Sequence, residues 1–209
     1  MRLLSPLFLS PLPESPRRPA FPEQREATMF EVVVINGSGG SGKDTFIDFF
    51  AEVIKSHPED SDTKVFRVSS VDEVKEIAAN LGWDGVKDDR GRRFLCDIKH
   101  ALTRYNDRPL NYMLHKVNEI KRNTHNNAVV FLFIREPEEI RKFISKVPSS
   151  TLLIRREDVE SFTNHADSSV FDFQYDVIFD NSGSLEELRD KAETFYGILK
   201  YWEYIKCHP

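Results

Sequence analysis

The chain has 209 residues, of which 40% are hydrophobic and 30% charged, a composition typical of one globular domain with a full core. Its formal net charge of -5 argues against nonspecific binding of nucleic acid. No segment approaches the ~20 apolar residues that span a bilayer, so no membrane partner is expected. Cys96 and Cys207 are too few for a disulfide framework or a zinc site and fit a reducing cytoplasm.

Residues 1–28 differ in kind from the rest of the chain. They hold six of the eleven prolines and show no helical or strand period. We expect a disordered extension that is dispensable or non-native, followed by one kinase-like domain over residues 29–209. Met29 stands directly before the first expected strand and is a candidate for the biological start.

From Phe30 onward, short apolar runs alternate with helical patterns, which predicts an α/β fold with a parallel sheet. Strands are expected over residues 30–36, 64–69, 128–134, 151–155 and 175–180. Helices are expected over residues 43–56, 71–81, 92–105, 109–123, 137–146 and 184–204. Ser184 and Glu187 have the spacing of a capping box at the start of the last helix.

The segment between the first strand and the first helix reads Gly-Ser-Gly-Gly-Ser-Gly-Lys-Asp-Thr. Glycines let the backbone curve around a polyphosphate, the following helix adds the positive end of its dipole, and Lys43 supplies an ammonium for the outer phosphates. A flexible linker with an ordinary helix cap would not need strand, loop, lysine and helix in this register. The residues expected to bind the nucleotide, ATP, are Gly37, Ser38, Gly39, Gly40, Ser41, Gly42, Lys43, Asp44 and Thr45. The pattern predicts a three-layer P-loop NTPase fold of the nucleoside monophosphate kinase-like kind, with a central parallel sheet.

Asp44 replaces the hydroxyl residue that usually follows the loop lysine and serves as a magnesium ligand. A carboxylate is also a suitable oxygen ligand for Mg²⁺, directly or through water. Thr45, one position later, still offers a hydroxyl. We therefore expect Asp44 and Thr45 to organise Mg²⁺.

Two later segments are candidates for binding a second substrate. Ser69 ends the second strand and Lys75 lies one turn into the next helix, which suits an acceptor phosphate, although Ser70 with Glu73 would equally serve as a helix cap. Residues 80–93 are polar, turn-rich and basic at their end, and a lid or substrate segment is expected near residues 82–108. The candidates there are Trp83, for stacking a base or for packing, and Arg90 and Arg93, for charge stabilisation or as solvated surface.

Arg135 follows the third strand, and ligands of open α/β sheets bind outside the carboxyl ends of strands. We therefore expect Arg135 to face the site, with Glu138 and Glu139 acting as partners of the helix dipole. Arg155 and Arg156 end the fourth strand and are candidates to face the site as well, although for one of them a structural role is equally expected.

Taken in order, several segments resemble the deoxynucleoside monophosphate kinases of phage and bacteria and, more distantly, the animal-type phosphomevalonate kinases. They are Gly42-Lys43-Asp44-Thr45, Val74–Ala78, Gly82-Trp83-Asp84-Gly85 with Lys87-Asp88 and Gly91-Arg92-Arg93, Arg135-x-Pro137-x-Glu139, the loop around His165, and Tyr175–Leu188. The resemblance covers roughly residues 30–200. It implies transfer of the γ-phosphoryl group of ATP, with Mg²⁺, to a small phosphorylated acceptor, a nucleoside monophosphate. It also implies a phosphate cradle on residues 37–45, substrate contacts near Ser69, Lys75, Trp83 and Arg93, and Arg135 at the reacting phosphates. From both arguments we expect catalytic roles for Lys43, Asp44, Arg93 and Arg135, with Arg90 as a further residue near the acceptor.

One departure from the family keeps two alternatives open. Family members often carry Asp two residues before the strand-end arginine, where this chain has Phe133, and the histidine loop keeps only the acidic Asp167 of its usual order. Loss of a carboxylate near Mg²⁺ favours a nucleotide-binding regulatory protein with little kinase activity. A change of acceptor, for example to phosphomevalonate, is the other alternative.

Overall fold

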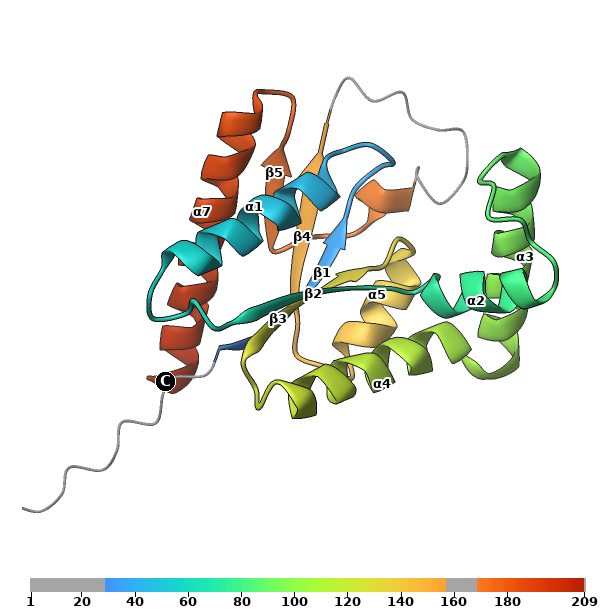
Figure 1. Cartoon of the computed structure of the whole chain (residues 1–209), viewed down its shortest axis with the longest axis horizontal. Coiled ribbons are helices and arrows are strands. Elements are labelled where there is room, and N and C mark those ends of the chain that lie inside the picture. Colours follow the sequence, from blue (N-terminus) through green and yellow to red (C-terminus); the bar gives the residue numbers. More distant parts are fainter. Residues whose placement is uncertain (1–28, 157–168, 209) are drawn as a thin grey trace, which may run out of the picture.

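The computed structural model describes residues 29–156 and 169–208 and contains one five-stranded sheet in the order β2-β3-β1-β4-β5 (Figure 1). All four strand pairs are parallel. The strands are β1 (Phe30–Asn36), β2 (Lys64–Ser69), β3 (Ala128–Phe133), β4 (Ser150–Arg155) and β5 (Val177–Asp180). The parallel sheet with helices on both faces confirms the predicted three-layer α/β fold.

The helices fall close to the predicted ranges. They are α1 (Lys43–Ser56), α2 (Asp72–Asn80), α3 (Asp89–Asn106), α4 (Arg108–Asn123), α5 (Pro137–Ile144) and α7 (Leu185–Cys207), with a 3-10 turn η1 (Ser169–Asp172) before β5. Ser184 accepts a hydrogen bond from the Glu187 backbone at 3.2 Å, which confirms the predicted cap of α7. Within the described ranges, none of these helices is both long and apolar enough to cross a membrane.

One helix begins earlier than expected. Residues 89–91 belong to α3, whereas the sequence pattern placed them in a polar loop. The Asp88 carboxylate accepts a hydrogen bond from Gly91 N at 2.7 Å, so it caps the helix three residues before its apolar pattern begins.

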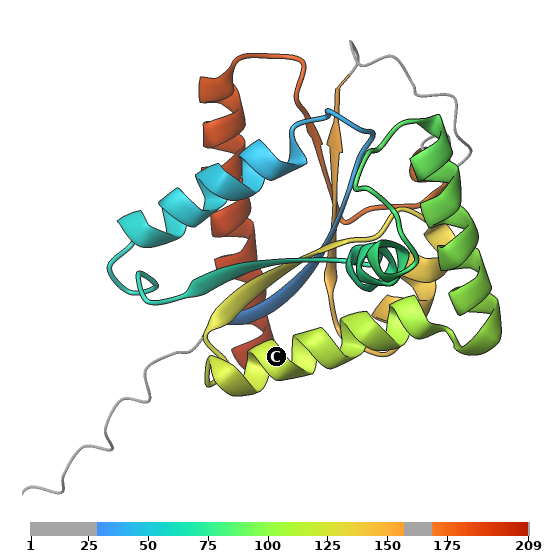
Figure 2. The same ribbon diagram turned by 45° about the vertical axis from the view of Figure 1, so that its right-hand side comes forward.

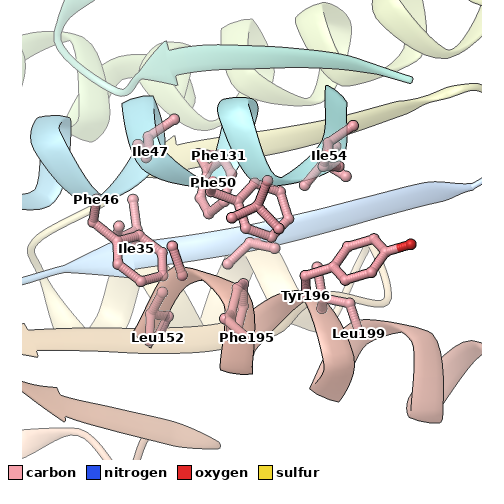
Figure 3. Close-up of a cluster of buried hydrophobic side chains, with 14 of the residues drawn as sticks. Ile35, Phe46, Ile47, Phe50, Ile54, Phe131, Leu152, Phe195, Tyr196 and Leu199 are labelled. Atoms are coloured by element: carbon pink, nitrogen blue, oxygen red, sulfur yellow. The ribbon is translucent and has the colours of Figure 1, made fainter. Parts of the chain in front are cut away.

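The first core layer lies between the sheet and the pair α1 and α7 (Figure 3). It is built largely from aromatic side chains. Phe50 packs edge-on against Phe131 of β3 at 5.2 Å between ring centroids, and Phe46 meets Phe195 of α7 at 5.9 Å. These contacts hold α1 against β1 and β3, and thereby fix where the first turn of α1 lies.

The second core layer lies on the opposite face, under α4 and α5. Met113 and Val117 of α4 and Ile140 and Phe143 of α5 are buried there against the alternate side chains of β1 and β3. The views in Figures 1 and 2 show α1 and α7 separated from α4 and α5 by the sheet. The helices α2, α3 and α4 are inserted between β2 and β3. Of these, α2 and α3 lie to one side of the sheet, and Gly91 is the one buried residue of α3.

The topology has a switch point between β1 and β3, and the region outside the carboxyl ends of these two strands is called the crevice below. These neighbouring strands lead into helices on opposite faces, β1 into α1 and β3 into α5. Open parallel sheets bind ligands outside the carboxyl ends of the strands at such a switch point. Both the glycine-rich loop and Arg135 follow these two strand ends.

Candidate functional site

The loop at residues 37–42 has a backbone that requires glycine at its two ends. Gly37 has φ of 144° and Gly42 has φ of 95°, both in the region that favours glycine. A Cβ on Gly37 would overlap the carbonyl oxygen of Ile154, and one on Gly42 would overlap the side-chain amide of Asn181. The loop is therefore packed tightly against β4 and against the turn that leads into α7.

The Lys43 ammonium lies against the loop that it follows. Its Nζ donates to the carbonyl oxygen of Gly37 at 2.6 Å and to that of Ser38 at 2.8 Å, with Ser41 Oγ at 3.3 Å. These contacts keep the charge at the mouth of the loop. A phosphate bound there would meet a cation already in position.

The first turn of α1 adds to this positive field. The backbone N–H groups of Lys43, Asp44 and Thr45 lie in the first turn of a 14-residue helix, where no intrahelical carbonyl accepts from them. Such a terminus carries about half a positive charge and binds phosphate well. Loop, lysine and helix end together form an anion site.

The oxygen donors near this anion site are few. Asp44 is exposed in the first turn of α1 and Thr45 is half-buried beside it. Phe133, at the end of β3, packs against the core under α1 and α7 and supplies no oxygen. In residues 29–156 and 169–208 no group of three or more His, Cys, Asp or Glu side chains could hold a metal alone. The Asp44 carboxylate and the Thr45 hydroxyl suit a Mg²⁺ ion that arrives bound to the phosphate oxygens of a nucleotide and completes its coordination with water.

Asn36 is the last residue of β1, directly before the glycine-rich loop, and the sequence analysis did not identify it. Its side chain is buried, and its Nδ2 donates to the carbonyl oxygen of Arg135 at 3.1 Å and to Tyr175 Oη at 2.7 Å. Its Oδ1 accepts from Gly37 N at 2.8 Å. Tyr175 in turn donates to the carbonyl oxygen of Val170 at 2.9 Å. A polar residue ending an apolar strand directly before a glycine loop was the available signal.

Burial raises the pKa of Tyr175 to about 12, against the opposing effect of the hydrogen bond from Asn36. The hydroxyl therefore stays protonated and keeps donating to Val170 well above neutral pH. This fixes the hydroxyl's lone pairs toward Asn36 and sets the orientation of the Asn36 amide.

Asn181 is a second buried amide beside the loop, and the sequence analysis did not single it out. Its Nδ2 donates to the carbonyl oxygen of Ser41 at 2.8 Å. It therefore supports the loop from the side of α7, opposite to the contact that Asn36 makes with Gly37. The glycine-rich loop is held at both ends by asparagine side chains.

The strand-end arginines have different surroundings. Arg135 is exposed at the crevice, with its backbone fixed by Asn36. Arg155 instead pairs with Asp180 of β5 at 3.2 Å, so it ties the two strands together. Of the two adjacent arginines, Arg155 is thus the structural one.

The residues near the start of α2 gather around Asp72. Its carboxylate accepts from Ser69 N at 2.8 Å and from Lys75 Nζ at 3.0 Å. The expected cap by Ser70 is wrong, because Val71 is the N-cap residue and no side chain caps α2. Ser69 and Lys75 are brought together at the carboxyl end of β2.

The candidates on and before α3 are dispersed. The Trp83 indole N–H donates to the carbonyl oxygen of Val86 at 3.1 Å, and the ring packs against Gly91, so the side chain closes its own loop. Arg90 and Arg93 are exposed. At 3.6 residues per turn, Arg90 lies opposite Lys99 on the helix and Arg93 lies on its flank.

Lys99 anchors α3 to the rest of the domain. Its Nζ lies 2.7 Å from Glu139 Oε2 of α5, and the two side chains are only 15% and 13% exposed. Glu139, expected to serve the helix dipole alone, therefore also makes a largely buried ion pair. This pair brings α3 toward the end of β3, where Arg135 lies.

Two surface hollows lie away from this site. Cavities of about 260 and 310 Å³ follow α4, one near Arg108 and Asn111, the other between α4 and the edge strand β2. Neither is lined by the glycine-rich loop. Residues 1–28 and the loop around His165, with Asp167, lie outside the described residues.

Comparisons with known proteins extend these observations only slightly. No family model and no curated protein matches the chain. Solved structures that are similar include an APS kinase of Mycobacterium tuberculosis in complex with AMPPNP and APS, at 10% identity over 83% of this chain and 99% of that chain, with a TM-score of 0.42. A sugar kinase from a Janibacter species is similar at 15% identity over 81% of this chain and 95% of that one, with a TM-score of 0.45. These neighbours are kinases, but at such scores they carry no argument about activity, and the family expected from the sequence stays a prediction.

Proposed function

We propose that this chain is an ATP-dependent kinase that transfers the γ-phosphoryl group to a nucleoside or deoxynucleoside monophosphate. The observation that carries the proposal is the glycine-rich loop, closed around the Lys43 ammonium at the carboxyl end of β1 and at the switch point of the sheet. This is where the polyphosphate of a nucleotide would be bound by backbone N–H groups and a helix end.

On the donor side, the loop residues 37–45 bind the phosphates and Lys43 neutralises their outer oxygens. Asp44 and Thr45 are the residues that would hold Mg²⁺, which when bound neutralises charge on the outer phosphates. Phosphoryl transfer depends mostly on positioning and charge stabilisation. The tight packing of Gly37 and Gly42 supplies the rigidity that positioning requires.

On the acceptor side, Arg135 lies at the crevice, and the inserted helices bring further cations. Lys75 and Ser69 lie at the end of β2, Arg93 lies on α3, and Trp83 and Arg90 belong to the lid segment proposed for residues 82–108. A phosphate acceptor is already an anionic nucleophile, so no strong general base is required. Arg135 and Arg93 would stabilise the charge that develops during transfer.

Phe133 supports a different class of function. Its side chain packs into the core where related kinases often have a carboxylate, so the magnesium would rely on Asp44 more than usual. A nucleotide-binding regulatory protein with little turnover is therefore the second candidate. A kinase for another phosphorylated metabolite, such as phosphomevalonate, keeps the same donor side.

The test is release of ADP in a coupled assay with a panel of nucleoside and deoxynucleoside monophosphates and phosphomevalonate. The wild type should release ADP with at least one monophosphate, and Lys43→Ala should lose this activity. Lys64→Ala, which removes an exposed lysine at the amino-terminal end of β2, is the matched control and should retain it. ATP binding without release across the panel would establish the regulatory candidate, and equal rates for wild type and Lys43→Ala would refute the site.

A further inference from the structure

We propose that Asn36, held in place by Tyr175, is a positioning residue that transmits nucleotide binding at the loop to Arg135 across the crevice. The inference rests on the function proposed above, and it concerns how the two sides of that site are coupled. It starts from the place of Asn36 in the sheet.

The backbone of Asn36 and its side chain serve different neighbours. Its backbone is in register with Leu153 of β4, whereas the last pair between β1 and β3 joins Ile35 to Phe133. Beyond that pair β1 and β3 separate. Past that point the Asn36 side chain connects the two strand ends, because its Nδ2 donates a hydrogen bond to the carbonyl oxygen of Arg135.

The amide of Asn36 has little freedom to do anything else. Both of its N–H groups have acceptors, Arg135 and Tyr175, and its oxygen accepts from Gly37 N. A rotation of the amide by 180° would place N–H against N–H at Gly37 and oxygen against oxygen at Arg135. Tyr175 excludes that state because its own proton is committed to Val170.

The connection has a mechanical consequence. Gly37 N–H and the carbonyl oxygen of Arg135 bind the same amide, so any displacement of one on phosphate binding is passed to the other through Asn36. Beyond the last strand pair, Ile35 with Phe133, this buried side chain links the phosphate cradle to the backbone of Arg135. Misplacement of a catalytic group by about 1 Å costs up to about 100-fold in rate, so this link matters to turnover.

Hydrogen–deuterium exchange of the full chain, with and without AMPPNP and Mg²⁺, tests the coupling directly. In the wild type, AMPPNP should slow exchange in residues 37–45 and also in residues 133–137. In Asn36→Ala, the slowing of residues 37–45 should remain, while protection of residues 133–137 should fall about fivefold, the factor expected for one lost hydrogen bond. Undiminished protection of residues 133–137 in Asn36→Ala would overturn the inference.

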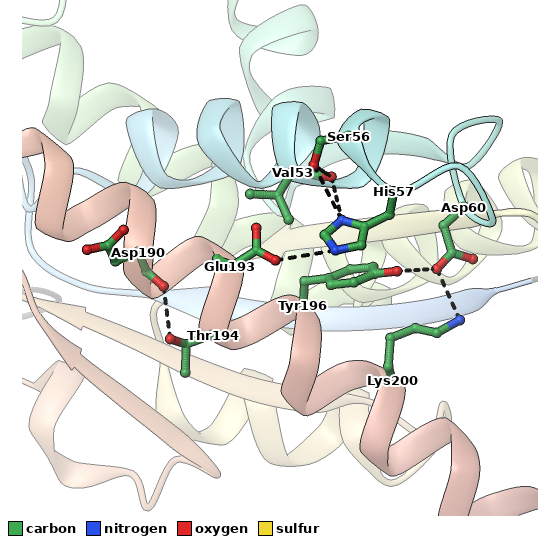
Figure 4. A network of polar contacts seen from close by, with 9 residues as sticks. All are labelled: Val53, Ser56, His57, Asp60, Asp190, Glu193, Thr194, Tyr196 and Lys200. Carbon is green, nitrogen blue, oxygen red and sulfur yellow. Dashed lines mark hydrogen bonds and ion pairs between the residues drawn. The ribbon is translucent and has the colours of Figure 1, made fainter.

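Tyr175→Phe is the milder variant if Asn36→Ala does not fold, and it should weaken protection of residues 133–137 in the same direction. Tyr196→Phe is its matched control. Tyr196 is another buried tyrosine, whose hydroxyl donates to Asp60 at 2.7 Å near the amino-terminal edge of the sheet (Figure 4). Loss of stability common to both tyrosine variants, without a specific effect of Tyr175→Phe on residues 133–137, would show a merely structural role and overturn the inference.

Steady-state kinetics of the two tyrosine variants distinguish failure of this inference from failure of the proposed function. Tyr175→Phe should lower kcat more than it raises the KM for ATP, and Tyr196→Phe should change neither. If AMPPNP protects no part of residues 37–45 in the wild type, the proposed function fails instead. The link through Asn36 is then tested by hydrogen–deuterium exchange without nucleotide. Asn36→Ala should accelerate exchange in residues 133–137 about fivefold. An unchanged exchange rate in these residues would show that the link does not exist.

Discussion

Removal of the Lys99 ammonium should reveal how firmly α3 is attached to α5. Exposed ion pairs contribute ~0–1 kcal/mol, and loss of one partner of a fully buried pair costs ~3–5 kcal/mol. At 15% and 13% exposure, with 2.7 Å between Nζ and Oε2, the Lys99–Glu139 pair lies near the buried limit. We expect Lys99→Met to lower the free energy of unfolding by ~2–3 kcal/mol, or the melting temperature by about 5–10 °C in a chain of this length.

A double-mutant cycle measures the interaction itself. Denaturant unfolding of wild type, Lys99→Met, Glu139→Gln and the double variant should give a coupling energy of about 2 kcal/mol. Lys142 and Asp107 form the control pair, at 3.1 Å but 51% and 44% exposed, and their cycle with Lys142→Met and Asp107→Asn should give less than ~0.5 kcal/mol. A coupling energy for Lys99 and Glu139 no larger than that of the control pair would refute the assignment of this contact as the anchor of α3.

Further predictions concern the loop, Tyr175 and the fourth strand. Gly37→Ala should abolish nucleotide binding measured by calorimetry and lower stability, because a Cβ would overlap the backbone of Ile154; wild-type affinity would contradict the described loop conformation. Tyr175 has a folded-state pKa of about 12, above its usual value of 10.0, so it stabilises the fold fully below pH 10 and loses that contribution as the pH rises toward 12. The loss should reach about 3 kcal/mol in denaturant titrations and should be absent in Tyr175→Phe; an identical pH dependence in both proteins would contradict it. Arg155→Met should change the rate of ADP release by less than about twofold, as expected for a surface substitution remote from a site, because Arg155 pairs with Asp180. A large loss of kcat would place this arginine in the site.

The order and type of the elements could be predicted because their signals are local. Apolar runs such as Val32–Ile35 and Val129–Leu132 are buried on both faces of the sheet, as parallel strands require. The glycines and Lys43 had to follow a strand for the motif to work, and they do. The start of α3 was misplaced because a single carboxylate, Asp88, decides it and the apolar period begins later.

Contacts between distant residues could not be predicted in the same way. Lys99 and Glu139 are 40 residues apart, and each alone has the pattern of a solvated helix surface. Asn36 and Asn181 become parts of the site only when β3 and the turn before α7 are placed beside the loop. Such residues depend on tertiary packing, and a polar residue ending an apolar strand was the sole local indication.

Identification of the reaction products tests the central claim most directly. The full chain is incubated with ATP, Mg²⁺ and each monophosphate in turn, and the nucleotides are separated and identified by mass spectrometry. The account predicts that ADP and the diphosphate of at least one acceptor appear in equal amounts, and that Lys43→Ala forms neither. The absence of any diphosphate, or its formation at the same rate by Lys43→Ala, would contradict it.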